Sequence, residues 1–308
     1  MRRARRLRVS IAASASERGA ERAPSRAIGH RIARWLADHL VVFAGAAVLA
    51  YLFLPIAVVV LLSFNRPASR LSYAFHEFTL DNWLHPCGAG DLCDSLLISV
   101  QIGFLATGIS TVLGTLMAFA LARHRFRGRA GTNLLIFLPM ATPEVVMGSS
   151  LLALFVASAV PLGFWTVLIA HVMFCLSFVV VTVKARLAGM DPHLEEAAAD
   201  LYATEWQTFR KVTLPQVMPG ILAAALLAFS LSFDDFIITN FNSGSTVTFP
   251  MYVWGSAQRG VPPQVNVVGT AMFAVALLVV LAGEVRRRRS TPAAVAGPPL
   301  PVLAEEGR

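Results

Sequence analysis

The sequence predicts an all-α membrane protein with six transmembrane helices. Of its 308 residues, 56% are hydrophobic and 14% are charged, which is too apolar for an ordinary soluble domain. Apolar runs of about 20 residues, the length that crosses a bilayer as a helix, recur along the chain. These runs lack the alternation of strands, and in lipid only helices and closed barrels satisfy their backbone hydrogen bonds. The six predicted spans cover roughly residues 40–64, 95–122, 134–157, 165–183, 217–241 and 265–283.

The basic residues predict the orientation of these spans. Of the 26 Lys and Arg residues, all but Arg66, Arg70 and Arg259 lie on one side of the predicted bundle. By the positive-inside rule this side, which includes both termini, faces the cytoplasm. The same distribution argues against nucleic acid as the partner that a net charge of +8 could suggest. We therefore expect the lipid bilayer to be the environment of the chain.

The two ends are expected to be disordered cytoplasmic tails around a transmembrane domain over residues 40–285. Residues 1–39 carry many arginines that suit an anionic membrane surface, and residues 286–308 are rich in Pro and Ala beyond four further arginines. The arginines at positions 2–8 could also belong to a targeting signal. No apolar region follows them before about residue 40, so we favour the tail.

The first two spans and the segment between them carry packing and redox signals. Pro55 removes a backbone donor from the first span and should kink it. The second span has small residues at Ser110, Gly114 and Ala118, a ridge that lets helices approach closely. In the external segment 65–94 two cysteines either form a disulfide or remain free thiols. These are Cys87 and Cys93, whereas Cys175 is expected to pack within the fourth span.

The third span is predicted to break near its middle. Pro139 and Pro143 interrupt its hydrogen-bond ladder. Thr142 is expected to cap a restarted half-helix, with Pro143 at its first position and Glu144 in its first turn, where the helix dipole favours a carboxylate. Glu144 is then either a capping acid or part of a solute pathway. In the fourth span, His171 is expected to form hydrogen bonds between helices rather than to relay protons.

A charged segment at 191–215 separates the fourth and fifth spans, and its first half is predicted to be a helix. Asp191 is a good N-cap and Pro192 a good first residue for a helix that runs to about Leu201. Two acids lie in its early turns, where the dipole favours negative charge. These acids are Glu195 and Glu196, and a small apolar face follows at Ala197, Ala198 and Leu201.

A second short helix is predicted to complete this loop. The capping box at 204–207 starts it, and it runs to about Val212 before Pro215 ends it. Two short helices can bind DNA, but this pair is acidic at its start and tethered at both ends. Docking into the groove of a soluble protein partner therefore fits this loop better than DNA binding does. The alternative is a loop that is only solvated and binds no partner.

Two acids interrupt the fifth span, in the run Ser232-Phe233-Asp234-Asp235-Phe236. Carboxylates inside an apolar run are costly and are therefore candidates for function. They either snorkel to the external surface or form an anionic patch that receives a cationic solute. Since neighbours cannot share a helix face, we expect Asp235 to face the solute and Asp234 to snorkel outward.

The 191–215 loop resembles the EAA coupling loop of permease subunits in binding-protein-dependent ABC importers. The register holds at Glu196-Ala197-Ala198, then at Val212 for the family's Ile and at Leu214-Pro215, while Tyr202 stands where the family prefers Gly. A Gly there could take the left-handed conformation that ends a helix. Because Tyr pays about 1–2 kcal/mol for that conformation, we expect the bend at Ala203 instead.

Further segments resemble the spermidine/putrescine permease branch of this family, and the resemblance covers roughly residues 40–285. They are Pro143-Glu144-Val145-Val146-Met147, Gly163-Phe164-Trp165, residues 174–183 and residues 232–236. The resemblance implies a type I ABC importer permease fold in the bacterial plasma (inner) membrane. It also implies three kinds of partner: ABC ATP-binding subunits, a second permease subunit and an extracytoplasmic solute-binding protein.

The expected function is therefore that of a permease subunit that translocates a polyamine, and not that of an enzyme. The chain has no Gly-x-x-x-x-Gly-Lys-Ser/Thr loop, so we expect ATP hydrolysis in a separate subunit. No cofactor is predicted, and no residues have the spacing of a metal site. The alternatives are import of ferric iron, a phosphonate or another organic cation, a channel or secondary transporter, and a membrane-embedded enzyme. The residues expected to couple to the ATPase are Glu195, Glu196, Ala197, Ala198, Leu201, Tyr202, Leu214 and Pro215. Those expected to line the solute pathway are Asp235, Asp234, Glu144 and Trp165.

Overall fold

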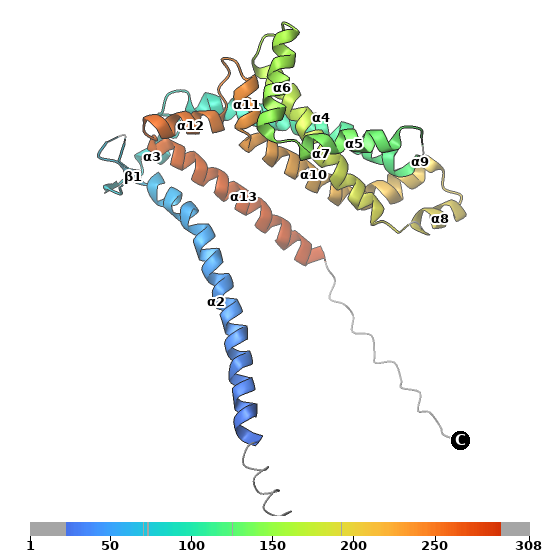
Figure 1. Cartoon of the computed structure of the whole chain (residues 1–308), viewed down its shortest axis with the longest axis horizontal. Coiled ribbons are helices and arrows are strands. Elements are labelled where there is room, and N and C mark those ends of the chain that lie inside the picture. Colours follow the sequence, from blue (N-terminus) through green and yellow to red (C-terminus); the bar gives the residue numbers. More distant parts are fainter. Residues whose placement is uncertain (1–22, 70, 73, 125, 192, 291–308) are drawn as a thin grey trace, which may run out of the picture. The chain divides into compact units, whose positions relative to one another are not determined.

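The computed structural model describes residues 23–290, apart from positions 70, 73, 125 and 192 (Figure 1). These residues fall into two compact units, one over Ser63–Val268 and one made of the described residues before and after it. Helix α2 (Ala23–Ser63) begins inside the segment that we predicted to be a disordered tail, and its part that could span a membrane begins at His39. The two outermost stretches, 1–22 and 291–308, lie outside the described residues.

Five of the described helices are long and apolar enough to cross a membrane, and a sixth span results if one sharply bent pair is counted as one. The sequence predicted six runs, and the described helices give five or six. The five are His39–Ser63 within α2, Leu92–Arg123 (α4), Phe164–Ala188 (α7), Glu205–Asp234 and Pro263–Gly283 within α13 (Pro263–Ser290). The bent pair is α5 (Arg129–Ala141) and α6 (Glu144–Ala157).

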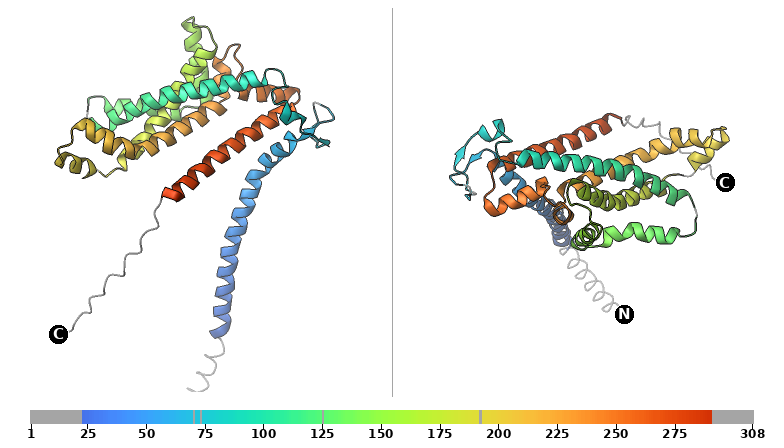
Figure 2. Two further views of the ribbon diagram at one scale, coloured as in Figure 1. Left: turned by 180° about the vertical axis from the view of Figure 1, so that it is seen from behind. Right: turned by 90° about the horizontal axis from the view of Figure 1, so that it is seen from above.

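The remaining elements of the unit Ser63–Val268 lie between these spans, except for three consecutive helices that together make up the span Glu205–Asp234. They are β1 (Asn65–Arg66), β2 (Glu77–Phe78), α3 (Asp81–Leu84), α8 (His193–Asp200), α9 (Glu205–Thr208), the π-helix η1 (Phe209–Thr213), α10 (Leu214–Asp234), α11 (Ile237–Asn242) and α12 (Phe249–Arg259). The predicted fifth span at 217–241 therefore ends earlier, at Asp234, and α12 was not predicted. Helices α8 and α9 lie at one end of the bundle of α4, α7 and α10, and α12 lies at the other end (Figure 1, Figure 2).

The bundle is built on close contact among α4, α7 and α10. The predicted small-residue ridge is confirmed, since Ser110, Gly114 and Ala118 are all buried. A Cβ atom on Gly114 would lie 2.7 Å from Cγ1 of Val179 on α7, so this site has no room for a side chain. Small residues thus let the two backbones approach, which is the main source of packing energy where lipid removes the hydrophobic drive.

The bend between α5 and α6 measures 108°. Pro143 has no N–H, so it cannot donate a backbone hydrogen bond to a carbonyl of the preceding turn. It also biases the residue before it, Thr142, towards the extended conformation that Thr142 adopts (φ −84°, ψ 132°). The predicted break is therefore present, but the predicted cap is wrong. The Thr142 hydroxyl donates to the Leu138 carbonyl at 2.7 Å, and Pro143 lies just before the helix instead of at its first position. Glu144 opens α6, as expected.

The segment 65–94 is held by buried amides and by a disulfide. The Asn82 side chain donates to the carbonyls of Ser63 and Asn65 at 3.2 and 3.0 Å. Strands β1 and β2 pair antiparallel beside it, a small exception to the all-α prediction. Cys87 and Cys93 form a disulfide, which decides between the two alternatives that the sequence left open.

The tight contact at Gly114 predicts opposite effects for two chemically identical substitutions on α4. Gly114→Ala forces the backbones apart and should lower the free energy of unfolding by about 1–3 kcal/mol. Gly108→Ala, at an exposed site with nothing within 4 Å, should be neutral or stabilise by up to about 1 kcal/mol through helix propensity. Thermal unfolding of the two purified variants measures this difference. Equal unfolding temperatures would contradict the packing role of the ridge.

Candidate functional site

Three of the four predicted pathway residues line one groove, which has a volume of about 720 Å³. Glu144 reaches it from the start of α6, and Asp234 and Asp235 reach it from the end of α10. The fourth, Trp165, does not line this groove; its side chain is exposed and packs edge-on against Phe164. The fold thus gathers the acids from two distant parts of the chain but leaves the tryptophan outside.

The Asp235 carboxylate is buried and fully engaged. It accepts hydrogen bonds from the Ile238 N–H at 3.3 Å and from the N–H and hydroxyl of Thr239, each at 2.8 Å. Nε2 of His171 lies 3.3 Å away, and its Nδ1 lies 2.7 Å from the Ser232 hydroxyl. His171 therefore connects α7 to α10 and α11, as the sequence analysis expected.

This network buries the aspartate that was expected to face the solute and leaves its neighbour exposed. Asp235, expected to face the solute, holds the start of α11 against α7 because its oxygens already have partners. Asp234 and Glu144 are the exposed acids of the groove. An exposed carboxylate can exchange its water for a cationic ligand, so these two are the stronger candidates.

Aromatic rings form much of the remaining groove wall. Phe236 packs on Trp254 of α12 with ring centroids 5.3 Å apart, and Phe233 lies 6.1 Å from Phe249. Aromatic faces attract cations and also cover methylene groups. The sequence analysis missed α12, although the aromatic residues near 249–254 were a signal. The groove therefore suits a ligand with both cationic and apolar parts.

The first half of the predicted loop forms a capped helix. Asp191 accepts a hydrogen bond from the His193 N–H at 3.0 Å, which confirms it as the cap of α8. The predicted first helical residue, Pro192, lies outside the described residues. Glu195 and Glu196 both lie in the first turn, where they complement the helix dipole.

Tyr202, and not Ala203, makes the bend that ends α8. Its φ is +58°, and it is one of only two non-glycine residues with positive φ in the described chain. Its N–H donates to the Ala199 carbonyl at 2.9 Å, and the next N–H, of Ala203, donates to the Ala198 carbonyl at 3.1 Å. These two bonds define a Schellman motif, in which the position that Tyr202 occupies must be left-handed. Geometry therefore overrides residue preference here.

The second half of the loop continues directly into the membrane-spanning helix. The predicted capping box is present, with the Thr204 hydroxyl accepting from the Gln207 N–H and the Gln207 side chain accepting from the Thr204 N–H. Pro215 does not end a helix, contrary to the prediction. The wider π-turn of η1 comes directly before α10, so Pro215 lies in the first turn of α10, where a missing donor is tolerated.

Glu195 attaches this loop to the bundle. It forms a two-pronged ion pair with Arg123 at the end of α4 and accepts a hydrogen bond from the Thr213 hydroxyl at 2.7 Å. Burial opposes its ionisation, but these hydrogen bonds and the charge of Arg123 lower the pKa of Glu195 below its ordinary value of 4.5. The stabilisation is thus present above the ordinary pKa and is lost as the pH falls through the lowered one.

The outer face of the loop is exposed and apolar. Leu201, Tyr202 and Trp206 are 81%, 95% and 67% exposed. Glu196 is also exposed and pairs with His193 at 3.0 Å. Large exposed apolar side chains that gather on a rigid element are typical of an interaction surface. The two acids therefore differ, since Glu195 holds the loop and Glu196 faces outward.

Known protein sequences resemble this chain over most of its length. Residues 110–285 match the family described as binding-protein-dependent transport system inner membrane component. The spermidine/putrescine transport system permease protein PotC of Haemophilus influenzae is 38% identical over 245 residues, 79% of this chain and 94% of that protein. PotC of Escherichia coli K12 is 37% identical over 80% of this chain and 92% of that protein. The putrescine transport system permease protein PotI of Escherichia coli K12 is 38% identical, over 72% and 82%.

Solved structures of bacterial ABC importers share the fold. A chain of the importer of the acidic polysaccharide alginate has a TM-score of 0.62 at 14% identity, with 85% of this chain and 100% of that chain covered. A chain of the MetNI methionine ABC transporter has a TM-score of 0.53 at 16% identity, over 65% and 96%. At these identities the likeness shows the fold alone.

The Schellman geometry predicts that glycine at position 202 stabilises the loop. Tyr202→Gly relieves a left-handed strain of about 1–2 kcal/mol, so the amides of residues 202 and 203 should exchange hydrogen several-fold more slowly. Ala203→Gly, one residue further and without positive φ, is the matched control and should not slow exchange. Hydrogen exchange read by mass spectrometry over 197–206 measures both. Slower exchange in the control alone would instead place the strain at Ala203.

Proposed function

Because the chain belongs to the family of inner-membrane components of binding-protein-dependent transport systems, we propose that it is the permease subunit of an ATP-driven importer of spermidine or putrescine. It is a multi-pass membrane protein with the fold of type I ABC importer permeases and a transport component, not an enzyme. The substrate class rests on the relatives named for spermidine and putrescine transport, which match this chain over most of their own length.

The observation that carries the proposal for the solute is the groove with two exposed acids and an aromatic wall. A polyamine has ammonium groups separated by methylene segments. Glu144 and Asp234 can replace the water that the ammonium groups lose, and rings such as Trp254 can cover the methylene segments. Each charged hydrogen bond contributes about 1.5–3 kcal/mol, enough to favour passage without trapping the solute.

The remaining assignments follow from placing this chain in a complete importer. We propose that residues 40–285 are the permease domain, that both termini are cytoplasmic, and that the loop 191–215 docks on an ABC ATP-binding subunit that hydrolyses ATP. Support comes from the exposed side chains of Leu201, Tyr202 and Trp206 on this loop. The loop and α12, which lines the groove, lie at opposite ends of the bundle (Figure 1). A second permease subunit and an extracytoplasmic solute-binding protein complete the proposed assembly.

Removal of the groove charges should impair transport without unfolding the protein. In proteoliposomes with the full transporter, Asp234→Asn and Glu144→Gln should each lower spermidine uptake about tenfold or more, the loss of one charged hydrogen bond. Their unfolding temperatures should stay unchanged, whereas Asp235→Asn should lower the unfolding temperature because it weakens a buried network. Asp94→Asn, at an exposed acid in the first turn of α4, is the control.

Unchanged uptake in both Asp234→Asn and Glu144→Gln would overturn the electrostatic pathway. The assignment to polyamines would then rest on the similarity to known permeases alone.

A charge reversal on the outer face of α8 should uncouple transport from ATP hydrolysis. Glu196→Lys puts a positive charge in the first turn of a helix and at the proposed docking surface. Uptake should fall at least tenfold, and ATPase subunits should co-purify less, while membrane insertion is unchanged. Glu77→Lys makes the same charge change on exposed β2 and should leave uptake normal. Normal uptake and normal co-purification in Glu196→Lys would exclude this docking role.

A further inference from the structure

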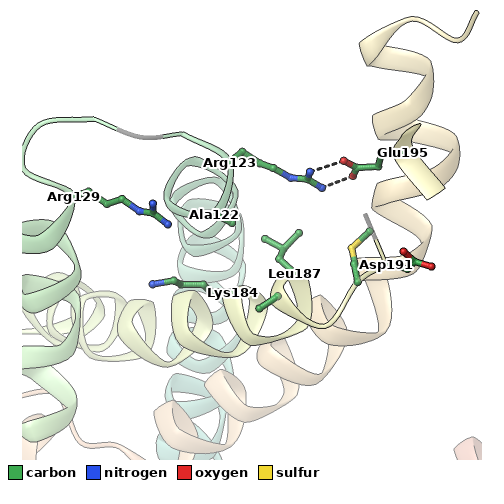
Figure 3. Close-up of a pocket in the computed structure, with 9 residues that line it drawn as sticks. Ala122, Arg123, Arg129, Lys184, Leu187, Asp191 and Glu195 are labelled. Atoms are coloured by element: carbon green, nitrogen blue, oxygen red, sulfur yellow. Dashed lines mark hydrogen bonds and ion pairs between the residues drawn. The ribbon is translucent and has the colours of Figure 1, made fainter. Parts of the chain in front are cut away.

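A basic pocket of about 270 Å³ lies where α4, α5, α7 and α8 meet (Figure 3). Arg123 comes from the end of α4, Arg129 from the start of α5 and Lys184 from the last turns of α7. Its volume is near the lower limit of small-molecule sites, about 300 Å³. Arg129 and Lys184 belong neither to the groove nor to the proposed docking surface of the loop. The proposed function therefore gives these two cations no role.

The two acids of this pocket already interact with groups other than Arg129 and Lys184. Glu195 forms the ion pair with Arg123. The Asp191 carboxylate caps α8 through the His193 N–H, and it points away from Arg129 and Lys184 in Figure 3. Neither acid therefore neutralises the remaining cations.

Arg129 and Lys184 reach toward one another from α5 and α7 (Figure 3). Both are half-buried. Lys184 donates one hydrogen bond, to the neutral Asn133 side chain at 2.7 Å. Within the described part of the chain no carboxylate pairs with either cation. Two like charges that share a partly buried site repel each other, and a bound anion between them removes that repulsion.

We propose that this pocket binds a phosphate group, supplied by an anionic phospholipid of the cytoplasmic leaflet. A phosphate oxygen pair matches the planar guanidinium of Arg129, and the Lys184 ammonium serves as a point charge on a third oxygen. The assignment to this leaflet rests on the proposed orientation, in which the loops 123–129 and 191–215 are cytoplasmic. Basic pockets between helix ends on that side are suited to lipid headgroups.

The surface beside the pocket favours a lipid over a free anion. Helix α5 begins at Arg129 and then exposes Leu134, Leu135 and Phe137 by 62%, 67% and 56%. These side chains begin little more than one turn from the pocket. A headgroup seated between Arg129 and Lys184 therefore has an apolar face at hand for its acyl chains, which inorganic phosphate would not use.

Lipid binding to the purified full transporter tests the proposal in the absence of spermidine and ATP. The probes are phosphatidylglycerol, phosphatidylcholine and inorganic phosphate. Phosphatidylglycerol alone should raise the unfolding temperature and remain bound in native mass spectrometry. The double variant Arg129→Gln/Lys184→Gln should bind it at least tenfold more weakly, the effect of losing one or more charged hydrogen bonds. Arg127→Gln, an exposed residue outside the pocket, is the matched control and should bind it normally.

Two results would overturn the proposal. Stabilisation by inorganic phosphate that depends on Arg129 and Lys184 would make the ligand a free anion instead of a lipid. Equal binding of phosphatidylglycerol to the double variant and to the unmodified transporter would remove the site altogether. An unchanged unfolding temperature of the double variant in phosphatidylcholine excludes misfolding as the cause of weaker binding. Spermidine uptake is measured separately, so failure here leaves the proposed function intact.

Discussion

The groove depends on the buried carboxylate of Asp235, which must be paired and hydrogen-bonded. A charge inside an apolar helical bundle is costly unless it is paired and hydrogen-bonded. Asp235 meets that requirement with two backbone N–H groups, the Thr239 hydroxyl and His171. These bonds end α10 and start α11 at a defined angle to α7. The adjacent Asp234 consequently stays exposed in the groove, opposite Glu144.

A second set of contacts connects the two ends of the bundle. Helix α4 packs against α7 through its small-residue ridge and also contacts α10, and at its end Arg123 holds Glu195 of the loop. The π-turn joins the loop to α10 without a break, and α10 ends at the groove acids. In the proposed transporter, a force applied to α8 therefore reaches the groove through two helices packed side by side. Such packed elements move as bodies because their interiors do not deform continuously.

Charged side chains have different structural roles at the two ends of the bundle. At the loop, the ion pair of Glu195 and Arg123 holds two elements together, while Glu196 at the next position is exposed and pairs with His193. At the groove, Asp235 is structural and Asp234 is exposed. At the loop the two acids differ because successive side chains of a helix point in different directions, and at the groove they differ because α10 ends at Asp234 and Asp235 is extended.

Patterns among neighbouring residues were enough to predict the membrane fold, the approximate spans, the broken third span and the two-helix loop. These features depend on local chemistry: apolar length, proline geometry, caps and charge asymmetry are all read from neighbouring residues. The tertiary structure decided which acid is buried, because the partner of Asp235 is His171, distant in sequence. It also assigned the left-handed bend to Tyr202, where the hydrogen bonds of the turn outweigh the preference of the residue, and it left Trp165 outside the groove. The burial of Asp235 depends on a contact between segments that are far apart in the chain, which a local pattern does not contain, whereas the bend at Tyr202 depends on the backbone geometry of a single turn.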